Sequence, residues 1–178
     1  MKIRTMVVAL AAALLVAGCG DADPGALGPV GVDGGLSPEG QRQQYVQGVG
    51  DALAQLGAAM GPSFSQAVDG GNRRQLQAAS LAWQQGSQQL QSIDPPEAAV
   101  ADHLALVKAV KALDAWNKRI VAAAPNKTAT KRLATQASRS PASAQFGTAI
   151  CKLVEDGFSV TDESACGAYA DAAAAGPG

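Results

Sequence analysis

The chain has 178 residues, of which 14 are basic, 15 are acidic and 3 are cysteine. This length suits one domain rather than several. Its near-neutral charge and its aromatic content of 4% exclude the basic, aromatic-rich pattern of nucleic-acid-binding proteins, so no nucleic-acid partner is expected.

Residues 1–18 have the organisation of a bacterial export signal. The basic start Met1–Arg4 precedes the apolar run Met6–Ala17, which is too short to cross a bilayer as a helix. The run ends in Leu15-Val16-Ala17-Gly18-Cys19. An ordinary secretory signal with a chance cysteine at its end is the alternative interpretation.

The sequence Leu15-Val16-Ala17-Gly18-Cys19 resembles the lipobox of bacterial lipoproteins. The resemblance implies cleavage between Gly18 and Cys19 and a diacylglyceryl group on the sulfur of Cys19. Two acyl chains hold a protein stably on a membrane. The resemblance therefore predicts a lipid-anchored protein on the extracytoplasmic face of the cell membrane.

Residues 19–36 read as a lipidated cysteine followed by a flexible linker. Gly and Pro crowd this stretch and no periodic pattern runs through it. As a random coil it reaches roughly 20–25 Å. The sequence then predicts a helical domain over residues 37–171 and a disordered tail over residues 172–178.

The basic residues of the mature chain are concentrated in one segment. Loss of Lys2 and Arg4 leaves 12 basic residues against 15 acidic ones. The segment 108–139 holds eight of them, opposed by Asp114 alone: Lys108, Lys111, Lys118, Arg119, Lys127, Lys131, Arg132 and Arg139. All of them except Arg139 are candidate contacts to anionic lipid headgroups or an anionic wall polymer. The alternative is a solvated helix face with its loop.

Two cysteines, Cys151 and Cys166, remain once Cys19 carries lipid. Disulfides persist outside the cytoplasm, so a structural disulfide between them is expected. Their wide spacing does not match a Cys-x-x-Cys redox pair. The chain has one histidine, and we expect neither a metal nor another cofactor.

The first two predicted helices start at polar caps. Ser37-Pro38-Glu39 supplies a cap, an N1 proline and a first-turn acid, and the apolar stripe that follows is Tyr45, Val49, Leu53, Leu56 and Met60. Gly61-Pro62 interrupts this helix before a short continuation that ends at Asp69-Gly70-Gly71. Asn72 caps the second helix, whose stripe is Leu76, Ala79, Trp83, Gly86, Leu90 and Ile93. Gly86 in that stripe permits close approach of a neighbouring helix.

The third helix is expected to open with a capping box at Asp94, with Pro95 at N1 and Glu97 at N3. It runs to about Ala124, with an apolar face made of Val100, Leu104, Val107, Val110, Leu113 and Ile120. Residues 127–139 are predicted to be a loop or a poorly anchored helix. Ser140-Pro141 caps a last helix that ends at Gly157-Phe158. The fold class is therefore all-α, an up-down four-helix-bundle-like domain.

The chain resembles small helical lipoproteins of high-GC Gram-positive bacteria, most of which have no assigned function. Besides the lipobox and its linker, the matching stretches are Gln44-Tyr45-Val46, Ile93-Asp94-Pro95-Pro96-Glu97 and His103-Leu104. The resemblance implies a membrane-anchored helical domain and supplies no catalytic residues.

The favoured function is a non-catalytic envelope lipoprotein that binds a protein or a cell-wall component. A small-molecule or lipid carrier is the alternative, and an enzyme is the least favoured class. His103 borders an apolar helix face, and Asp102 beside it points about 100° away. Packing is therefore a better explanation for His103 than catalysis.

Overall fold

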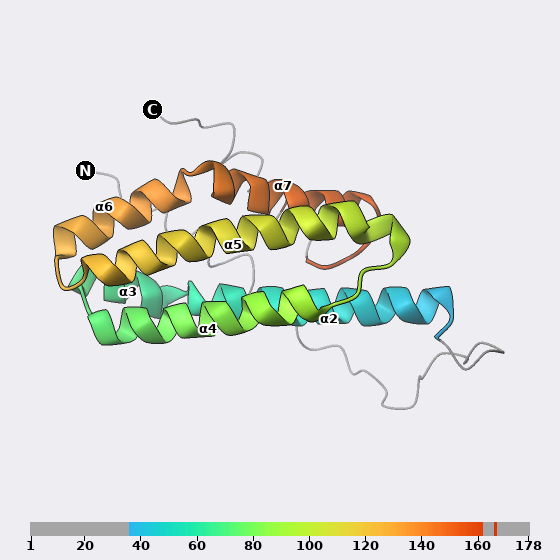
Figure 1. Cartoon of the computed structure of the whole chain (residues 1–178), viewed down its shortest axis with the longest axis horizontal. Coiled ribbons are helices and arrows are strands. Elements are labelled where there is room, and N and C mark those ends of the chain that lie inside the picture. Colours follow the sequence, from blue (N-terminus) through green and yellow to red (C-terminus); the bar gives the residue numbers. More distant parts are fainter. Residues whose placement is uncertain (1–35, 162–165, 167–178) are drawn as a thin grey trace.

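The computed structural model describes residues 36–161 and Cys166, and this part is built from helices (Figure 1). In chain order they are α2 (Pro38–Ala59), α3 (Pro62–Gly70), α4 (Arg73–Ser92), the 3-10 turn η1 (Glu97–Ala99), α5 (Val100–Ala123), α6 (Lys127–Ser138) and α7 (Pro141–Glu155). The predicted all-α fold is confirmed.

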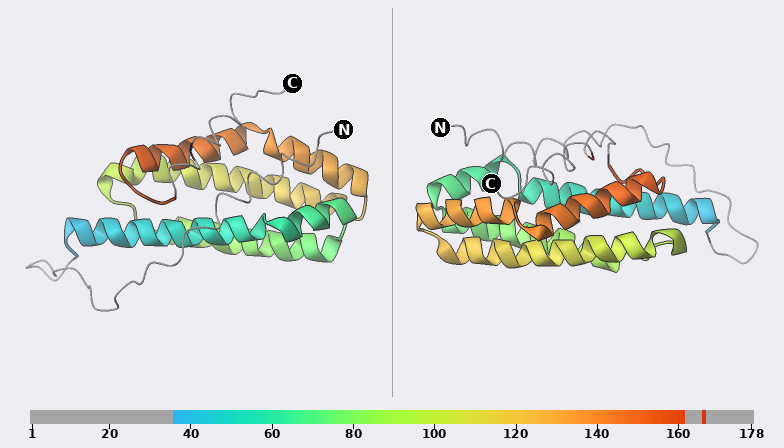
Figure 2. Two further views of the ribbon diagram at one scale, coloured as in Figure 1. Left: turned by 180° about the vertical axis from the view of Figure 1, so that it is seen from behind. Right: turned by 90° about the horizontal axis from the view of Figure 1, so that it is seen from above.

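The helices form four antiparallel columns (Figures 1 and 2). The first column holds α2 and α3, the second α4, the third α5, and the fourth α6 and α7. The first and fourth columns are broken at Gly61-Pro62 and Ser140-Pro141, because proline clashes with the preceding turn and donates no hydrogen bond to it. Six α-helices of the described part thus occupy the four columns of an up-down bundle.

The two ends of this bundle differ. We call one the entry end: it holds residue 36, the α4–α5 connection, the start of α5 and the end of α7 (Figure 1). We call the other the far end: it holds α3, the first turns of α4, the last two turns of α5 and the first half of α6.

Side-chain caps start four of the helices. Ser37 Oγ accepts from the Gly40 amide at 3.1 Å, and Asn72 Oδ1 accepts from the Gln75 amide at 3.2 Å. Ser140 Oγ accepts from the Ser143 amide at 3.4 Å. Asn126 adds a cap that the sequence analysis did not assign, through the Ala129 amide at 3.0 Å. These caps satisfy amides that have no partner inside their own helix.

The predicted capping box at Asp94 is wrong. Asp94, Pro95 and Pro96 remain outside any helix, η1 follows at Glu97, and α5 begins only at Val100. A residue that precedes proline is disfavoured in the α region, so Pro95 cannot serve as N1 when Pro96 follows it. Pro96 itself is extended, with φ −62° and ψ 153°.

The prediction of a loop or poorly anchored helix over residues 127–139 is also wrong. This segment forms α6, which packs on α3 and α5. Thr130 is fully buried, and its hydroxyl donates to the carbonyl of Val68 at 3.0 Å and that of Lys127 at 2.9 Å. Thr130 has a low helix propensity, but its hydroxyl forms a hydrogen bond that holds α6 to α3.

The buried face of α5 is rotated from the predicted one. Val100 and Leu104 are 39% and 60% exposed, whereas His103 and Leu106 are buried. The buried stripe continues through Ala109, Val110, Asn117 and Ile120. Polar His103 and Asn117 take core positions because the helix packs against neighbours on the side that carries them, which hydropathy alone does not reveal.

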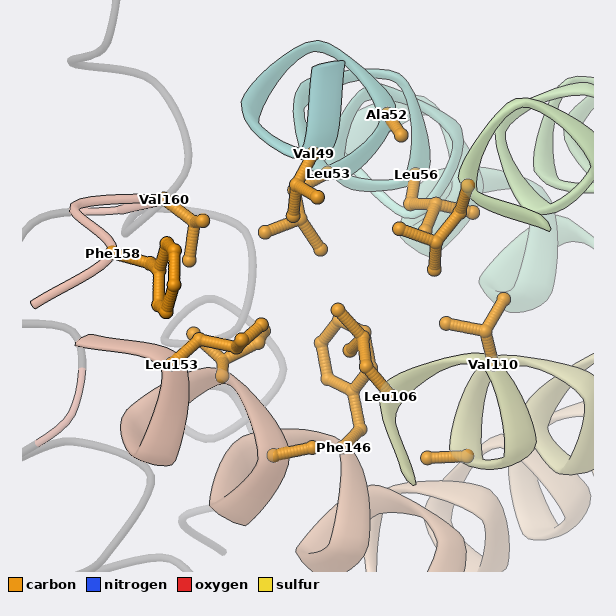
Figure 3. Packing of buried hydrophobic residues seen from close by; sticks show 14 of the residues in the cluster. Val49, Ala52, Leu53, Leu56, Leu106, Val110, Phe146, Leu153, Phe158 and Val160 are labelled. Carbon is orange, nitrogen blue, oxygen red and sulfur yellow. The ribbon is translucent and has the colours of Figure 1, made fainter. Parts of the chain in front are cut away.

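The interior has two apolar clusters. The main cluster joins α2, α4, α5 and α7 around Tyr45, Leu53, Leu106, Phe146 and Leu153 (Figure 3). The second, at the far end, joins Phe64, Val68, Leu76, Ile120 and Ala137. Trp83 belongs to the main cluster and Trp116 packs on the second, so both tryptophans contribute to the core.

Gly86 permits α2 and α4 to approach closely, as predicted. A Cβ at this position would lie 3.1 Å from Leu56 Cδ2 and 3.3 Å from the carbonyl oxygen of Ala52. Any larger residue would push the two helices apart, since one of these atoms belongs to the backbone.

Candidate functional site

The basic side chains of the 108–139 segment are all exposed, and most of them lie in the far half of the bundle. Lys108 and Lys111 lie midway along α5, whereas Lys118 and Arg119 lie in its last two turns. The fold adds two more basic residues, because the start of α4 reaches the far end. The full far-end set is Arg73, Arg74, Lys118, Arg119, Lys127, Lys131 and Arg132.

Two acidic residues partly neutralise this far-end set. Lys118 pairs with Asp114 at 2.6 Å, and Lys131 pairs with Asp69 at 3.0 Å. The guanidinium of Arg119 lies over the Trp116 ring, 4.9 Å from its centroid. Within the described residues, Arg74, Lys127 and Arg132 form no ion pair, so their charges face solvent.

Backbone contacts hold the two far-end turns together. Gly71 adopts φ 65°, and a Cβ there would lie 2.5 Å from the carbonyl oxygen of Pro125. The Arg73 guanidinium donates to the carbonyl of Ala124. The α3–α4 turn therefore sits directly on the α5–α6 turn, which fixes the basic side chains of α4, α5 and α6 relative to one another.

The entry end carries the opposite charge. Its acidic residues come from the columns of α2, α5 and α7 and from the connection before α5: Glu39, Asp94, Glu97, Asp102, Glu155 and Asp156. The basic residues there are Arg42 and Lys152. Arg42 donates to the carbonyl of Gly157 and lies over the Phe158 ring at 5.2 Å. The bundle is thus acidic where the chain enters and basic at the far end.

Two carboxyl groups meet at the entry end. Partial burial raises the pKa of Asp102, a hydrogen bond with Asp156 raises it further, and the charge of Lys152 lowers it. The nearby charges of Asp156 and Glu155 add to the rise. Two carboxyls at hydrogen-bond distance hold one proton between them more readily than two charges. This pair links the start of α5 to the end of α7.

Tyr45 and His103 form a buried pair beneath those carboxyls. Both are 2% exposed, and the Tyr45 hydroxyl lies 3.3 Å from Nδ1 of His103. Burial lowers the pKa of His103, and a hydrogen bond to the backbone of Leu90 opposes that effect. Burial also raises the pKa of Tyr45 to about 12, helped by the charge of Asp102. Both rings are therefore neutral near pH 7 and sit inside the packed core.

Cys151 and Cys166 lie together although the sequence separates them by a turn and the end of α7. Both are half-buried thiols. Burial, together with a hydrogen bond to Cys166, raises the pKa of Cys151 to about 12. Their predicted disulfide remains a prediction, and the contact between the two thiols favours it.

A groove of about 580 Å³ lies at the entry end, between the start of α2 and the α4–α5 connection. Tyr45, Gly48, Ile93 and the two prolines of the connection supply its apolar lining, while Gln41 and Gln44 supply amides. Leu36, where the described chain begins, is part of the rim. The volume suits a small ligand by size, and the lining is neutral except for Asp94.

Three buried polar atoms on α4 and α5 have no hydrogen-bond partner: Trp83 Nε1, Asp114 Oδ1 and Asn117 Nδ2. Sequence analysis missed Asn117, which stands seven residues after Val110 in the buried stripe. That spacing was the available signal, because a polar residue in an apolar stripe marks a buried polar group.

Several predicted features fall outside the described residues: the signal, Gly18, Cys19, most of the linker, the last part of the predicted domain apart from Cys166, and the tail 172–178. Over the described range there is no helix long and apolar enough to span a membrane. The same range has no group of three or more side chains suited to hold a metal ion. Comparison of the chain with protein-family models, curated proteins and solved structures finds no match.

Proposed function

We propose that this protein is an envelope lipoprotein, held by a diacylglyceryl group on Cys19, whose non-catalytic helical domain binds an anionic cell-wall polymer. The observation that carries this proposal is the separation of charge along the bundle. The basic residues of three helices meet at the far end, and the acidic ones gather where the chain enters.

Because the anchor joins the bundle at the entry end, the separation of charge has a defined orientation relative to the membrane. The 24 residues of α5 span about 36 Å at 1.5 Å per residue. This exceeds the roughly 20–25 Å reach of the linker. The acidic entry end is nearest to the membrane and is repelled by anionic headgroups. The far end therefore points outward, where a polymer rich in phosphate or carboxylate groups meets it.

The surface suits an extended polyanion better than a single small anion. Arg74, Lys127 and Arg132 come from separate turns on two helices and are exposed without an ion pair in the described part. Each well-placed basic residue contributes about 1 kcal/mol near an anionic surface. Several weak contacts along one chain add up, and they weaken together when salt screens them.

A matched pair of triple variants tests the polymer. The first changes Arg74, Lys127 and Arg132 to Gln, and the second changes Lys108, Lys111 and Arg139 to Gln. Both remove the same charge from exposed positions. With a soluble polyglycerol-phosphate chain as probe, we expect the first variant to bind at least tenfold more weakly, about 1.4 kcal/mol, and the second to lose much less.

Equal losses in both variants would show an effect of net charge and contradict a far-end site. Vesicles with and without phosphatidylglycerol form the second arm of the experiment. Stronger binding to the anionic vesicles than to the polymer would identify the anchoring membrane as the partner and overturn the outward orientation.

The anchor has a separate test. Replacing Cys19 by Ala is expected to abolish acyl labelling and to release the protein from the membrane fraction. A membrane-bound Cys19→Ala protein would refute the lipid anchor, whatever the polymer experiment shows.

The groove at the entry end favours a second candidate function, the transport of a small molecule or lipid. Its lining, polar and apolar together and neutral except for Asp94, would take a ligand without strong negative charge. A thermal shift with a member of a lipid and metabolite panel, lost on replacing Gly48 by Leu, would support this function. The absence of any shift across the panel would count against it.

A further inference from the structure

In the entry half of the bundle, the first and fourth columns meet in a seam between α2 and α7, whereas at the far end α3 and α6 pack on each other. α2 packs closely on α4, and α7 packs closely on α5, whereas the backbones of α2 and α7 approach each other less closely than either pair. Side chains of both helices fill the space between them, among them Leu53 and Leu153 (Figure 3). The seam is therefore the side of the main core with the least backbone protection.

Residues 157–160 close this seam at the entry end, and we call them the C-terminal cover. Phe158 and Val160 are buried and lie at the edge of the main cluster, between α2 and α7 (Figure 3). The Phe158 ring meets Tyr45 edge to face, with centroids 5.3 Å apart. The cover thus packs on Tyr45, the residue that pairs with His103.

Local hydrogen bonds turn the chain from α7 into the cover. Gly157 adopts φ 82°, its amide donates to the Val154 carbonyl at 2.9 Å, and the Phe158 amide donates to the Leu153 carbonyl at 2.8 Å. Across the seam, the cover is held to α2 by Arg42, which donates to the carbonyl of Gly157. These contacts are noncovalent and few, so opening the cover costs little.

The two cysteines flank the cover in the sequence. Cys151 is on α7 before the cover, and Cys166 follows it in the sequence and returns to contact the Cys151 thiol. A bond between them would enclose the cover in a loop fastened to α7 at both of its ends.

We propose that Cys151 and Cys166 form a disulfide that fastens the C-terminal cover across the seam between α2 and α7, and that reduction of this bond releases the cover. This inference concerns the integrity of the bundle and is independent of the proposed polymer.

The oxidant belongs to the class of disulfides, such as glutathione disulfide or an oxidised thiol oxidoreductase. The thiolate of Cys166 attacks one oxidant sulfur and expels the other as a thiolate, which leaves a mixed disulfide. Cys151 then attacks the sulfur of Cys166 and expels the second oxidant thiolate. The two cysteines lose two protons and two electrons, and the oxidant ends as two thiols.

The order of these steps follows from the environment of Cys151. The pKa of Cys151 is raised to about 12 by burial and by the neighbouring thiol, so its thiol is protonated at neutral pH and is a poor nucleophile. The first attack therefore falls to Cys166. Once Cys166 carries the mixed disulfide, its sulfur is already beside Cys151.

Peptide mapping tests the bond on the full chain. Cleavage after Arg139 and Lys152 separates peptide 140–152, which holds Cys151, from peptide 153–178, which holds Cys166. Protein treated with glutathione disulfide, alkylated and digested without reductant is expected to give these two peptides as one linked species. Two separately alkylated peptides would overturn the disulfide.

Hydrogen exchange tests the consequence. In the oxidised protein the amides of Gly157 and Phe158 are expected to exchange at least tenfold more slowly than in the reduced protein, and the melting temperature is expected to be higher by about 10 °C. The double variant Cys151→Ser/Cys166→Ser is expected to match the reduced protein under both conditions. If the two peptides are linked but the amides of the cover exchange at the same rate in both states, the disulfide does not fasten the cover. That result would overturn the proposal.

Discussion

The two ends of the bundle are built from different chemistry. At the entry end, several contacts involve groups that titrate or oxidise: the Tyr45–His103 pair and the carboxyls of Asp102 and Asp156, which join columns, and the thiols of Cys151 and Cys166. At the far end, an exposed ion pair joins Asp69 to Lys131, but the buried or backbone contacts are approaches and hydrogen bonds of Gly71, Arg73 and Thr130, whose groups do not titrate between pH 4 and pH 9.

Because of this difference, we expect pH and reductant to change the stability of the entry end more than that of the far end. Acid or reductant acts on the entry end, whereas the basic far end keeps its arrangement. A binding surface at the far end would therefore retain its shape under conditions that loosen the core near the chain entry. Four substitutions measure the two ends against each other.

The largest effect is expected from Phe158→Ala at the entry end. Phe158 is 4% exposed and packs on Tyr45, so truncation leaves a cavity in the seam and costs about 3–4 kcal/mol of unfolding free energy. Urea denaturation measures the loss, and Ser159→Ala, at an exposed neighbour, is the control. A loss below about 1 kcal/mol would show that the cover is not part of the core.

Gly71→Ala is expected to weaken the far end by about 2–3 kcal/mol. Part of the cost is the left-handed backbone at Gly71, and the remainder is the displacement of Pro125 by the new methyl group. Gly70→Ala is the matched control, because a Cβ there meets nothing within 4 Å and alanine favours a helix. Equal stability of the two variants would contradict the close contact between the far-end turns.

Thr130→Val is expected to cost about 1 kcal/mol. Valine keeps the shape of the buried side chain but removes the hydroxyl donor to Val68, which leaves that bond unmade. Thr135→Val is the control, since its hydroxyl bonds the Lys131 carbonyl at an exposed site. Amide exchange in α6 reads out the effect, and faster exchange in Thr135→Val than in Thr130→Val would refute the anchoring role of Thr130.

The smallest effect is expected from His103→Gln, which changes how the free energy of unfolding depends on pH. Because the folded pKa of His103 lies below the ordinary 6.5, the neutral ring is favoured in the fold, so this stability is fully present above pH 6.5 and is lost as pH falls toward the folded pKa. His103→Gln is expected to flatten that loss between pH 7.5 and pH 5 in urea denaturation. An unchanged slope would assign the titration to another group.

The contribution of Asp102 to stability changes with pH in the opposite direction to that of His103. The variant Asp102→Asn removes this contribution and serves as the control. The raised carboxyl pKa of Asp102 gives stability that is fully present below the ordinary value of 3.8 and is lost as pH rises through the raised value. Measuring His103→Gln in the Asp102→Asn background separates the two groups. The groups that face Asp102 are Lys152, Glu155 and Asp156.

Helix positions were largely predictable from the sequence. Ser37, Asn72 and Ser140 each cap the expected helix, and the break at Gly61-Pro62 occurs where predicted. These features depend on residues within one turn of one another, so local hydrogen bonds and proline geometry suffice to fix them. The consecutive prolines 95 and 96 show the limit, because the second restrains the first and displaces the helix start.

Which face each helix buries was less predictable. The apolar pattern of α5 pointed to Leu104, yet the fold buries His103 and Asn117 and exposes Leu104. α6 looked too polar to pack, yet Thr130 is fully buried against Val68. For His103 and for Thr130, a hydrogen-bond partner comes from another column, Tyr45 and Val68 respectively, and no local pattern identifies it.

By itself, the sequence determined the export signal pattern, the helix starts and the presence of a basic segment and two late cysteines, since each depends on residues that are neighbours along the chain. Only the tertiary structure decided that Arg73 and Arg74 join that segment at one end, that six acidic residues gather at the other, and that Cys151 meets Cys166. The physical reason is antiparallel packing, which brings together charged groups and thiols that are far apart in the sequence.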